Sequence, residues 1–278
     1  MDKKILILTD CDGTLLSDDY NFSEFTIETT REIYEKGHLL IPITARTLKN
    51  LKNISNQLNL EELNGIIAAN NGAQIYDFKN KKFILNSVLN KQIIQNVFNM
   101  YYKPKSDQKE DKVNFTSENY VYSFGHSENT LKWSSIMEQE NCVISSPDEI
   151  KEEITSISII TKKGTTIQEF ETKLKKINEL FGSDYKIDAY HNRVISIAPK
   201  NIDKGYAAKL IIEYLKPKEY ITYGFGDSYN DISLFNSVDN PIAMLNGIDE
   251  LKEISKDTTK FDNTQDGVCR YLKDNKII

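Results

Sequence analysis

Short apolar runs alternate with amphipathic stretches along the first part of the chain. The runs at residues 5–8, 39–43 and 65–69 have the length of strands and contain no polar alternation, which is typical of strands buried on both faces of a parallel sheet. Between them, residues 23–36 have the features of a capped helix, and apolar residues recur at helical spacing over residues 48–58. This order predicts an α/β fold with a doubly wound parallel sheet.

The pattern changes near residue 75. Residues 74–85 contain two short strand-like segments separated by a polar turn, which predicts a hairpin. Beyond it, strand-like segments outnumber helices, which favours an antiparallel sheet with helices on one face. The alternation of helix and strand returns after Pro199. We therefore expect a core formed by residues 1–83 and 189–278, interrupted by an inserted α+β domain at residues 84–188.

Composition narrows the class of protein and of partner. The 278 residues are 39% hydrophobic and 27% charged, as in a globular protein with a core, and the net charge of −6 argues against a nucleic-acid or anionic membrane partner. No segment approaches the roughly 20 consecutive apolar residues of a membrane span, and the apolar stretch near the N-terminus is too short for a signal peptide. Three scattered cysteines are simplest to interpret as reduced thiols. We expect a cytoplasmic protein.

Two carboxylates directly follow the first apolar run. Asp10 and Asp12 stand one residue apart, where a parallel strand would meet solvent. Ligands of open parallel sheets bind outside the carboxyl ends of the strands. Two like charges this close repel each other unless a cation or a shared proton is present. The pair predicts a divalent metal, a carboxylate nucleophile beside a carboxylic acid, or both, whereas the alternative is a strand that simply ends in an Asp-Gly turn.

The second run is followed by Thr44 and Arg46, and Lys204 stands at the start of a later helix. A hydroxyl and an arginine fork suit phosphate, although Thr44 or Thr47 could equally cap the next helix. A cation at a helix N-terminus is disfavoured by about 0.3–1 kcal/mol, so an anion near Lys204 should compensate. The alternative for Lys204 is a surface pair with Asp203.

The last polar segment, Gly226–Asp231, follows another strand-like run. Ser228 or Asn230 could cap the following helix, but capping does not require the two acids Asp227 and Asp231 four residues apart. Acidic oxygens suit a hard cation such as Mg²⁺.

The order and spacing of these segments resemble the motifs of the haloacid dehalogenase superfamily, and within it the Cof-like phosphatases. The segments are Asp10–Leu16, Thr44–Arg46, Lys204–Gly205 and Gly226–Asp231. In that group an α/β cap is inserted between the second and third motifs. The resemblance implies a Rossmann-like core and a cap, here residues 84–188, that determines substrate specificity.

The resemblance also implies a mechanism. Asp10 would attack the phosphorus of a phosphate monoester and form an aspartyl-phosphate, and Asp12 would protonate the leaving oxygen and later deprotonate water. Mg²⁺ would be held by the carboxylates of Asp10 and Asp227, the backbone carbonyl of Asp12, and Asp231 acting through water.

Four further residues have implied roles toward the substrate. Thr44 and Lys204 would bind phosphate oxygens as charge shifts in the transition state. Asn230 would orient phosphate or a metal-bound water, and Arg46 would contact the substrate.

The sequence thus predicts a magnesium-dependent phosphatase that hydrolyses a small phosphorylated metabolite, such as a sugar phosphate or a similar monoester. One alternative is a phosphomutase, which would pass the phosphoryl group to a sugar hydroxyl. Another is a non-catalytic sensor of phosphorylated ligands that depends on a metal; the presence of both Asp10 and Asp12 counts against it.

Overall fold

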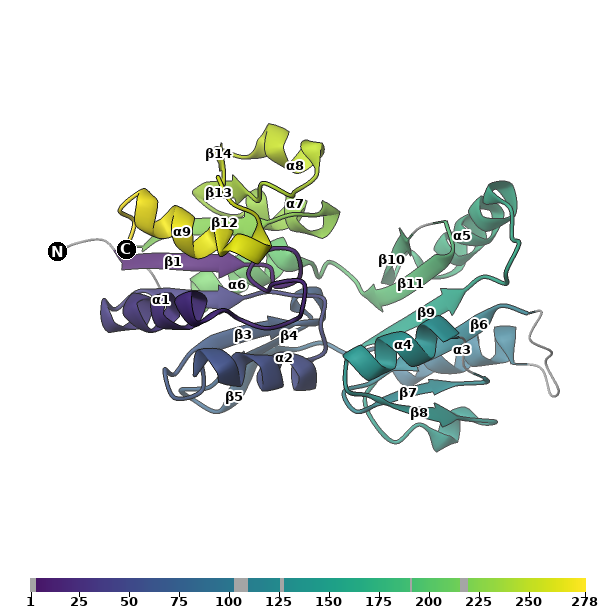
Figure 1. The fold of residues 1–278 in the computed structure, drawn as a ribbon. Helices are drawn as coiled ribbons and strands as arrows, with labels where there is room; N and C mark the ends of the chain where they lie inside the picture. Colours follow the sequence, from purple (N-terminus) through teal and green to yellow (C-terminus); the bar gives the residue numbers. More distant parts are fainter. Residues whose placement is uncertain (1–3, 103–109, 126–127, 191, 216–219) are drawn as a thin grey trace. The chain divides into compact units, whose positions relative to one another are not determined.

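The computed structural model describes residues 4–102, 110–125, 128–190, 192–215 and 220–278 (Figure 1). Two compact units form, one from residues 1–86 and 202–278 and the other from residues 87–201. We call them unit 1 and unit 2. Within the described ranges, no helix is both long and apolar enough to cross a membrane.

Unit 1 is built on a five-stranded parallel sheet with the order β14-β13-β12-β1-β2. The direction of strand addition reverses between β1 and β12, and such switch points are where open α/β sheets bind ligands. The strands are β1 (Lys4–Thr9), β2 (Leu39–Pro42), β12 (Tyr220–Gly226), β13 (Asn240–Ala243) and β14 (Asp257–Thr258).

Both faces of this sheet are buried, as the uninterrupted apolar runs predicted. Ile5 and Ile7 of β1 belong to a cluster that includes residues of α1, α2 and α9, whereas Leu6 and Leu8 belong to a second cluster with residues of α6. This alternation confirms the doubly wound, Rossmann-like core. The helices are α1 (Glu24–Glu35), α2 (Leu48–Ser55), α6 (Lys204–Leu215), α7 (Ile232–Phe235), α8 (Asp249–Ile254) and α9 (Gly267–Asp274).

Side chains next to the helix N-termini determine where three helices of unit 1 begin. Ser23 accepts from the third amide of α1, Thr47 does the same for α2, and the Asp203 carboxylate accepts from the Tyr206 amide in α6. Because Thr47 caps α2, the hydroxyl of Thr44 is not used for that purpose.

A small antiparallel sheet completes unit 1. It contains β3 (Ile66–Ala69), β4 (Gln74–Asp77) and β5 (Lys82–Asn86), and β4 and β5 form the expected hairpin. A parallel bridge between Ile43 and Ala68 places β3 beside the end of β2.

Unit 2 has a six-stranded sheet with the order β10-β11-β9-β6-β7-β8. All neighbouring strands are antiparallel except β7 and β8, which are parallel. The strands are β6 (Lys112–Thr116), β7 (Tyr120–Ser123), β8 (Glu140–Val143), β9 (Ser156–Ile160), β10 (Tyr185–Tyr190) and β11 (Val194–Pro199). The helices are α3 (Lys91–Tyr101), α4 (Glu128–Ile136) and α5 (Ile167–Phe181).

Helices cover both faces of the unit 2 sheet, not one face as the sequence suggested. Apolar residues of α3 and α5 share a cluster with Val113 and Phe115 of β6. Asn114 lies between these two residues and so faces the other side, where its amide donates to Thr130 of α4 at 3.0 Å. The sequence indicates that a helix forms in this region, but not which face of the sheet it packs against.

The boundaries of unit 2 also differ from the expected insertion at residues 84–188. β10 pairs along its length with β11, and β11 pairs with β9. A boundary after residue 188 would therefore cut a strand that is hydrogen-bonded within one sheet, and the compact unit ends at Asn201.

Candidate active site

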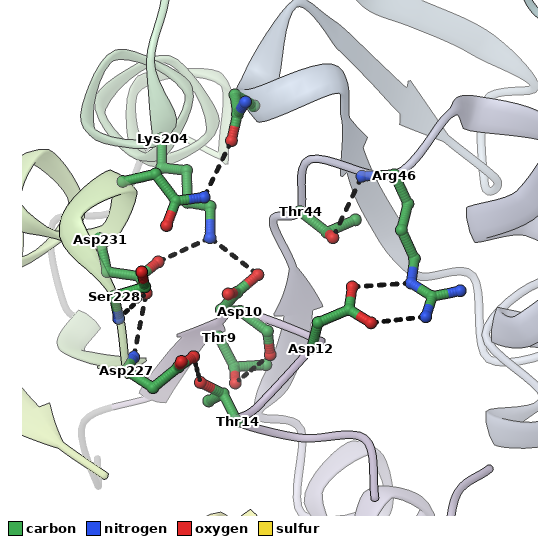
Figure 2. Close-up of polar contacts among 12 residues, drawn as sticks. Thr9, Asp10, Asp12, Thr14, Thr44, Arg46, Lys204, Asp227, Ser228 and Asp231 are labelled. Carbon is green, nitrogen blue, oxygen red and sulfur yellow. Dashed lines mark hydrogen bonds and ion pairs between the residues drawn. The ribbon is translucent and has the colours of Figure 1, made fainter. Parts of the chain in front are cut away.

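The carboxyl ends of β1 and β12 bring the first and last polar segments together. The two strands are adjacent, with Thr9 opposite Phe225, and the amide of Asp10 donates to the carbonyl of Phe225 at 3.0 Å. Asp10 follows β1 directly, and Asp227 follows β12. Residues more than 200 positions apart thus meet at the switch point of the sheet (Figure 2).

Lys204 is fully buried and forms ion pairs with two carboxylates. Its Nζ lies 2.7 Å from Oδ1 of Asp10 and 2.6 Å from Oδ1 of Asp231. The partner is therefore not Asp203, which caps the helix that Lys204 begins. Burial, the largest influence, lowers the pKa of Lys204, but the two carboxylates more than offset it, so the pKa lies above its ordinary value. The ammonium remains charged.

Asp231 also orders the loop that follows β12. Its Oδ2 accepts hydrogen bonds from the amides of Asp227 and Ser228, both at 3.0 Å. A side chain at Gly226 would not fit, because a Cβ there would lie 2.5 Å from the Cβ of Asp231. Asp231 is thus a capping residue and the second partner of Lys204.

The turn after β1 contacts the carboxylate of Asp227, whereas Asp231 binds the backbone amide of Asp227. Thr14 donates its hydroxyl proton to Oδ1 of Asp227 at 2.8 Å. Gly13 has a φ of +74°, and a Cβ there would lie 2.7 Å from Oδ2 of Asp227. Sequence reasoning gave no site role to Thr14, although its place directly after Asp-Gly was a usable signal.

One oxygen each from Asp10, Asp227 and Asp231 lies within 4.8 Å of the others. Burial raises the pKa of Asp10 to about 8, with Lys204 opposing and the neighbouring aspartates adding to the rise. Burial likewise raises the pKa of Asp227 to about 6, against the hydrogen bond from Thr14. Three carboxylates facing one ammonium leave excess negative charge, and carboxylate oxygens are the ligands that hard divalent cations prefer. The cluster could hold a metal ion.

Asp12 points away from this cluster. Its carboxylate accepts two hydrogen bonds from Arg46, from Nε at 2.8 Å and from Nη2 at 2.5 Å (Figure 2). β1 ends at Thr9, and the next residues turn so that three successive amides donate to the carbonyl of Cys11. The alternating geometry of a strand therefore does not extend to Asp12, and the two acids have different partners.

Arg46 is almost completely buried, with 2% of its side chain exposed. Its Nη1 donates to Oδ1 of Asn50 at 2.7 Å, and its guanidinium carbon lies 5.2 Å from the centre of the Tyr20 ring. Burial, the largest influence, lowers the pKa of Arg46, but Asp12 more than offsets it, so the net change is upward. Sequence reasoning singled out neither Asn50 nor Tyr20, because no local pattern connects them to Arg46.

Thr44 and Asn230 lie on two different loops. The Thr44 hydroxyl is buried and accepts from the amide of Arg46 at 3.3 Å. Asn230 is exposed in a short 3₁₀ turn, and its amide donates to Oδ1 of Asn71 at 3.2 Å. The Asn71 amide in turn donates to the carbonyl of Thr44 at 2.8 Å. Asn71, to which sequence reasoning gave no site role, thus connects the two loops.

The model of one protein family, the haloacid dehalogenase-like hydrolases, matches residues 7–272. The chain belongs to this family. The resemblance seen in the sequence motifs is therefore confirmed, and the eight site residues predicted from the haloacid dehalogenase motifs all lie within the matched range.

Curated relatives match this haloacid dehalogenase-like hydrolase over nearly its whole length. It is 26% identical over 284 residues to a 5-amino-6-(5-phospho-D-ribitylamino)uracil phosphatase from Bacillus subtilis, covering 98% of this chain and 97% of the relative. A shorter match, 38% identical over 105 residues, covers 38% of this chain and 43% of a phosphoglycolate phosphatase from Sulfurisphaera tokodaii.

Solved structures share the complete fold. A haloacid dehalogenase-like hydrolase from Bacteroides thetaiotaomicron superposes with a TM-score of 0.83 at 18% identity, covering 99% of this chain and 100% of the other. A sugar phosphatase of subclass IIB gives 0.76 at 20% identity with the same coverage. At these identities the likeness establishes the fold alone.

Proposed function

We propose that this hydrolase is a magnesium-dependent phosphatase that cleaves a small phosphorylated metabolite, such as a sugar phosphate, through an aspartyl-phosphate on Asp10. The observation that carries the proposal is the buried ammonium of Lys204, 2.7 Å from Asp10 at the switch point of the sheet. A nucleophilic carboxylate beside a fixed cation suits attack on an anionic phosphoryl group. The phosphatases among the relatives support the reaction class.

The residues divide the reaction between them. Asp10 attacks phosphorus, and the charge of Lys204 opposes the effect of burial on the Asp10 pKa and so favours the reactive carboxylate. Asp12 protonates the leaving oxygen and then takes a proton from the water that hydrolyses the intermediate. The Thr44 hydroxyl and the Lys204 ammonium stabilise phosphoryl oxygens as charge shifts.

Asp10, Asp227 and Asp231, with the backbone carbonyl of Asp12, are the groups that would hold Mg²⁺. When bound, the cation offsets the repulsion between the carboxylate nucleophile and a phosphate dianion. The three carboxylates fit this assignment because one lysine does not balance their charge.

Three further features complete the proposal. We assign substrate selectivity to unit 2. A sugar-like substrate agrees with the phosphoribityl compound in the name of the Bacillus subtilis relative and with the sugar phosphatase of the same fold. The free thiols of Cys11, Cys142 and Cys269 fit the reducing cytoplasm, where we place the enzyme.

The test is release of inorganic phosphate from 4-nitrophenyl phosphate and from a panel of phosphorylated metabolites, with Mg²⁺ and with a chelator. We expect activity only with the metal and a loss of about 10³-fold or more in Asp10→Asn, because that variant lacks the nucleophile. Circular dichroism should show the variant folded. Retention of more than about 5% of activity would refute the assignment of Asp10 as the nucleophile.

The same assays separate the two alternatives. Phosphoryl transfer to an added sugar with little free phosphate would indicate a phosphomutase. A complete lack of cleavage with every divalent metal would indicate a sensor.

A further inference from the structure

The guanidinium of Arg46 contacts both oxygens of the Asp12 carboxylate and is held in place by other residues. Both carboxylate oxygens accept hydrogen bonds from Arg46, and a third N–H of Arg46 donates to Asn50 of α2. Bidentate pairs of this kind are among the stronger hydrogen-bonded contacts in proteins. The geometry therefore determines where the Asp12 side chain points.

The two partners differ sharply in exposure. The Arg46 side chain is 2% exposed, whereas that of Asp12 is 43% exposed. Arg46 is also anchored at its backbone, where its amide donates to Thr44 and its carbonyl accepts from Asn70. Arg46 is thus the stationary member of the pair, and Asp12, next to solvent, is the member that is able to rotate.

Tyr20 covers the guanidinium at the expense of backbone strain. Its φ of 62° lies in the left-handed region, which is uncommon for a bulky residue and costs about 1–3 kcal/mol. The turn is held by a hydrogen bond from the Tyr20 amide to the Ser17 carbonyl, and the ring lies 5.2 Å from the Arg46 guanidinium carbon. Cation–π attraction to the ring adds to the restraint on Arg46.

Protonation of the leaving oxygen requires Asp12 in a different place. The leaving group is bound to the phosphorus that Asp10 attacks, and Asp10 faces Lys204 (Figure 2). Asp12 faces Arg46 and is not part of the cluster of three carboxylates. Its side chain must leave the Arg46 fork before it acts as an acid.

We propose that Arg46 is a positioning residue that holds the Asp12 carboxylate away from the nucleophile in the resting protein. The step that protonates the leaving group then includes rotation of Asp12 out of the fork. This inference rests on the phosphatase function proposed above, and it differs from the sequence expectation that Arg46 contacts the substrate. Arg46 acts through Asp12.

A double-mutant cycle tests this coupling with two probes, 4-nitrophenyl phosphate and phenyl phosphate. Phenoxide is the more basic leaving group and depends more on protonation. We expect Arg46→Met to raise kcat/KM for phenyl phosphate relative to 4-nitrophenyl phosphate by about fivefold, because Asp12 is no longer held aside. In an Asp12→Ala background the same substitution should leave this ratio unchanged within about twofold, because the residue through which Arg46 acts is absent.

Inhibition by inorganic phosphate provides the readout of direct binding. An inhibition constant unchanged by Arg46→Met supports the proposal, because Arg46 then does not contact the phosphoryl group. Equal losses in both backgrounds, with weaker phosphate inhibition, would instead show that Arg46 binds the substrate. If Arg46→Met instead lowers the ratio of kcat/KM for phenyl phosphate to that for 4-nitrophenyl phosphate in the protein that retains Asp12, Arg46 holds Asp12 in its working position. Either result overturns the proposal.

Tyr20→Asn is a second variant in case Arg46→Met does not fold. Asparagine tolerates the left-handed backbone, so this change removes the ring without adding strain. We expect the ratio to shift in the same direction as in Arg46→Met but by less, about twofold, and no shift would count against the proposal. Absence of phosphate release by the unmodified protein would refute the proposed function itself, so the two failures are distinguishable.

Discussion

The sheets of the two units place their polar groups in opposite ways. In unit 1, both faces of the parallel sheet are buried, so charged groups gather at its carboxyl edge, where Asp10, Lys204 and Asp227 meet. In unit 2, one face of the sheet is apolar, whereas the other carries neutral polar side chains together with charged ones, among them an ion pair within β10. Ser158 is opposite both Asn114 and Ser196 in the register, so these three side chains form a row across the strands.

The difference agrees with the proposed division, in which unit 1 carries the chemistry and unit 2 selects the substrate. Buried charges are costly unless they are paired. In unit 1 the buried Lys204 is paired with two carboxylates at hydrogen-bonding distance. The hydroxyl groups of Ser158 and Ser196 are partly exposed, so they could bind a polar ligand at little desolvation cost. We therefore expect substitutions of the clustered charged residues of unit 1 to abolish turnover, and substitutions on the polar face of unit 2 to change which substrate is preferred.

The largest effect is expected from removal of the buried cation. Lys204→Met leaves Asp10 and Asp231 without their partner, which should lower the free energy of unfolding by about 3–5 kcal/mol and kcat by about 10²-fold or more. Urea denaturation and phosphate release measure the two losses, and Mg²⁺ should restore part of the stability. Lys209→Met, on the exposed part of the same helix, is the matched control and should change neither quantity.

Gly13→Ala tests whether the cluster depends on close packing. The new Cβ would meet the Asp227 carboxylate, so we expect activity to fall about tenfold or more and Mg²⁺ to bind more weakly, as measured by calorimetry. Gly37→Ala is the matched control, because Gly37 has nearly the same φ, +75°, with no atom within 4 Å. It should cost about 1 kcal/mol of stability and leave activity intact. Equal effects of both substitutions would mean that backbone strain alone is responsible.

The raised carboxyl pKa values predict that Mg²⁺ affinity depends on pH. With a pKa of about 8, Asp10 of the metal-free protein gains a proton as the pH falls from 8 to 6, and Mg²⁺ must displace it. Affinity should fall by about tenfold per pH unit for one displaced proton. Calorimetric titration at several pH values measures the slope, and Asp10→Asn should reduce it. A constant affinity across this range would contradict the prediction.

The smallest effect should follow from changes on the polar row of unit 2. Ser158→Ala combined with Ser196→Ala should raise KM for the preferred phosphorylated metabolite by about two- to tenfold, because two hydroxyl groups are lost. Turnover of 4-nitrophenyl phosphate should stay unchanged, since its leaving group lacks the hydroxyl groups of a sugar. If both substrates are affected equally, the contrast between the two units does not hold at this row.

The sequence by itself indicated most elements of unit 1 and the residues that we expect to carry the chemistry. Uninterrupted apolar runs indicated strands buried on both faces, and Asp10, Asp227 and Lys204 stood next to predicted element ends, where parallel sheets bind ligands. Even the need for an anion near Lys204 followed from its place at a helix N-terminus. These features depend on neighbours within a few residues, so they can be detected from the chain alone.

Only the tertiary structure decided which side chains pair with one another and which elements pack together. Asp12 pairs with Arg46 because the chain turns directly after Thr9, and Lys204 pairs with Asp10 because α6 starts beside the end of β1. The parallel pairing of β7 with β8 and the packing of α4 on the second face of its sheet were likewise hidden. Each of these contacts joins segments remote in sequence, and their geometry depends on how whole elements pack, which no local pattern of residues specifies.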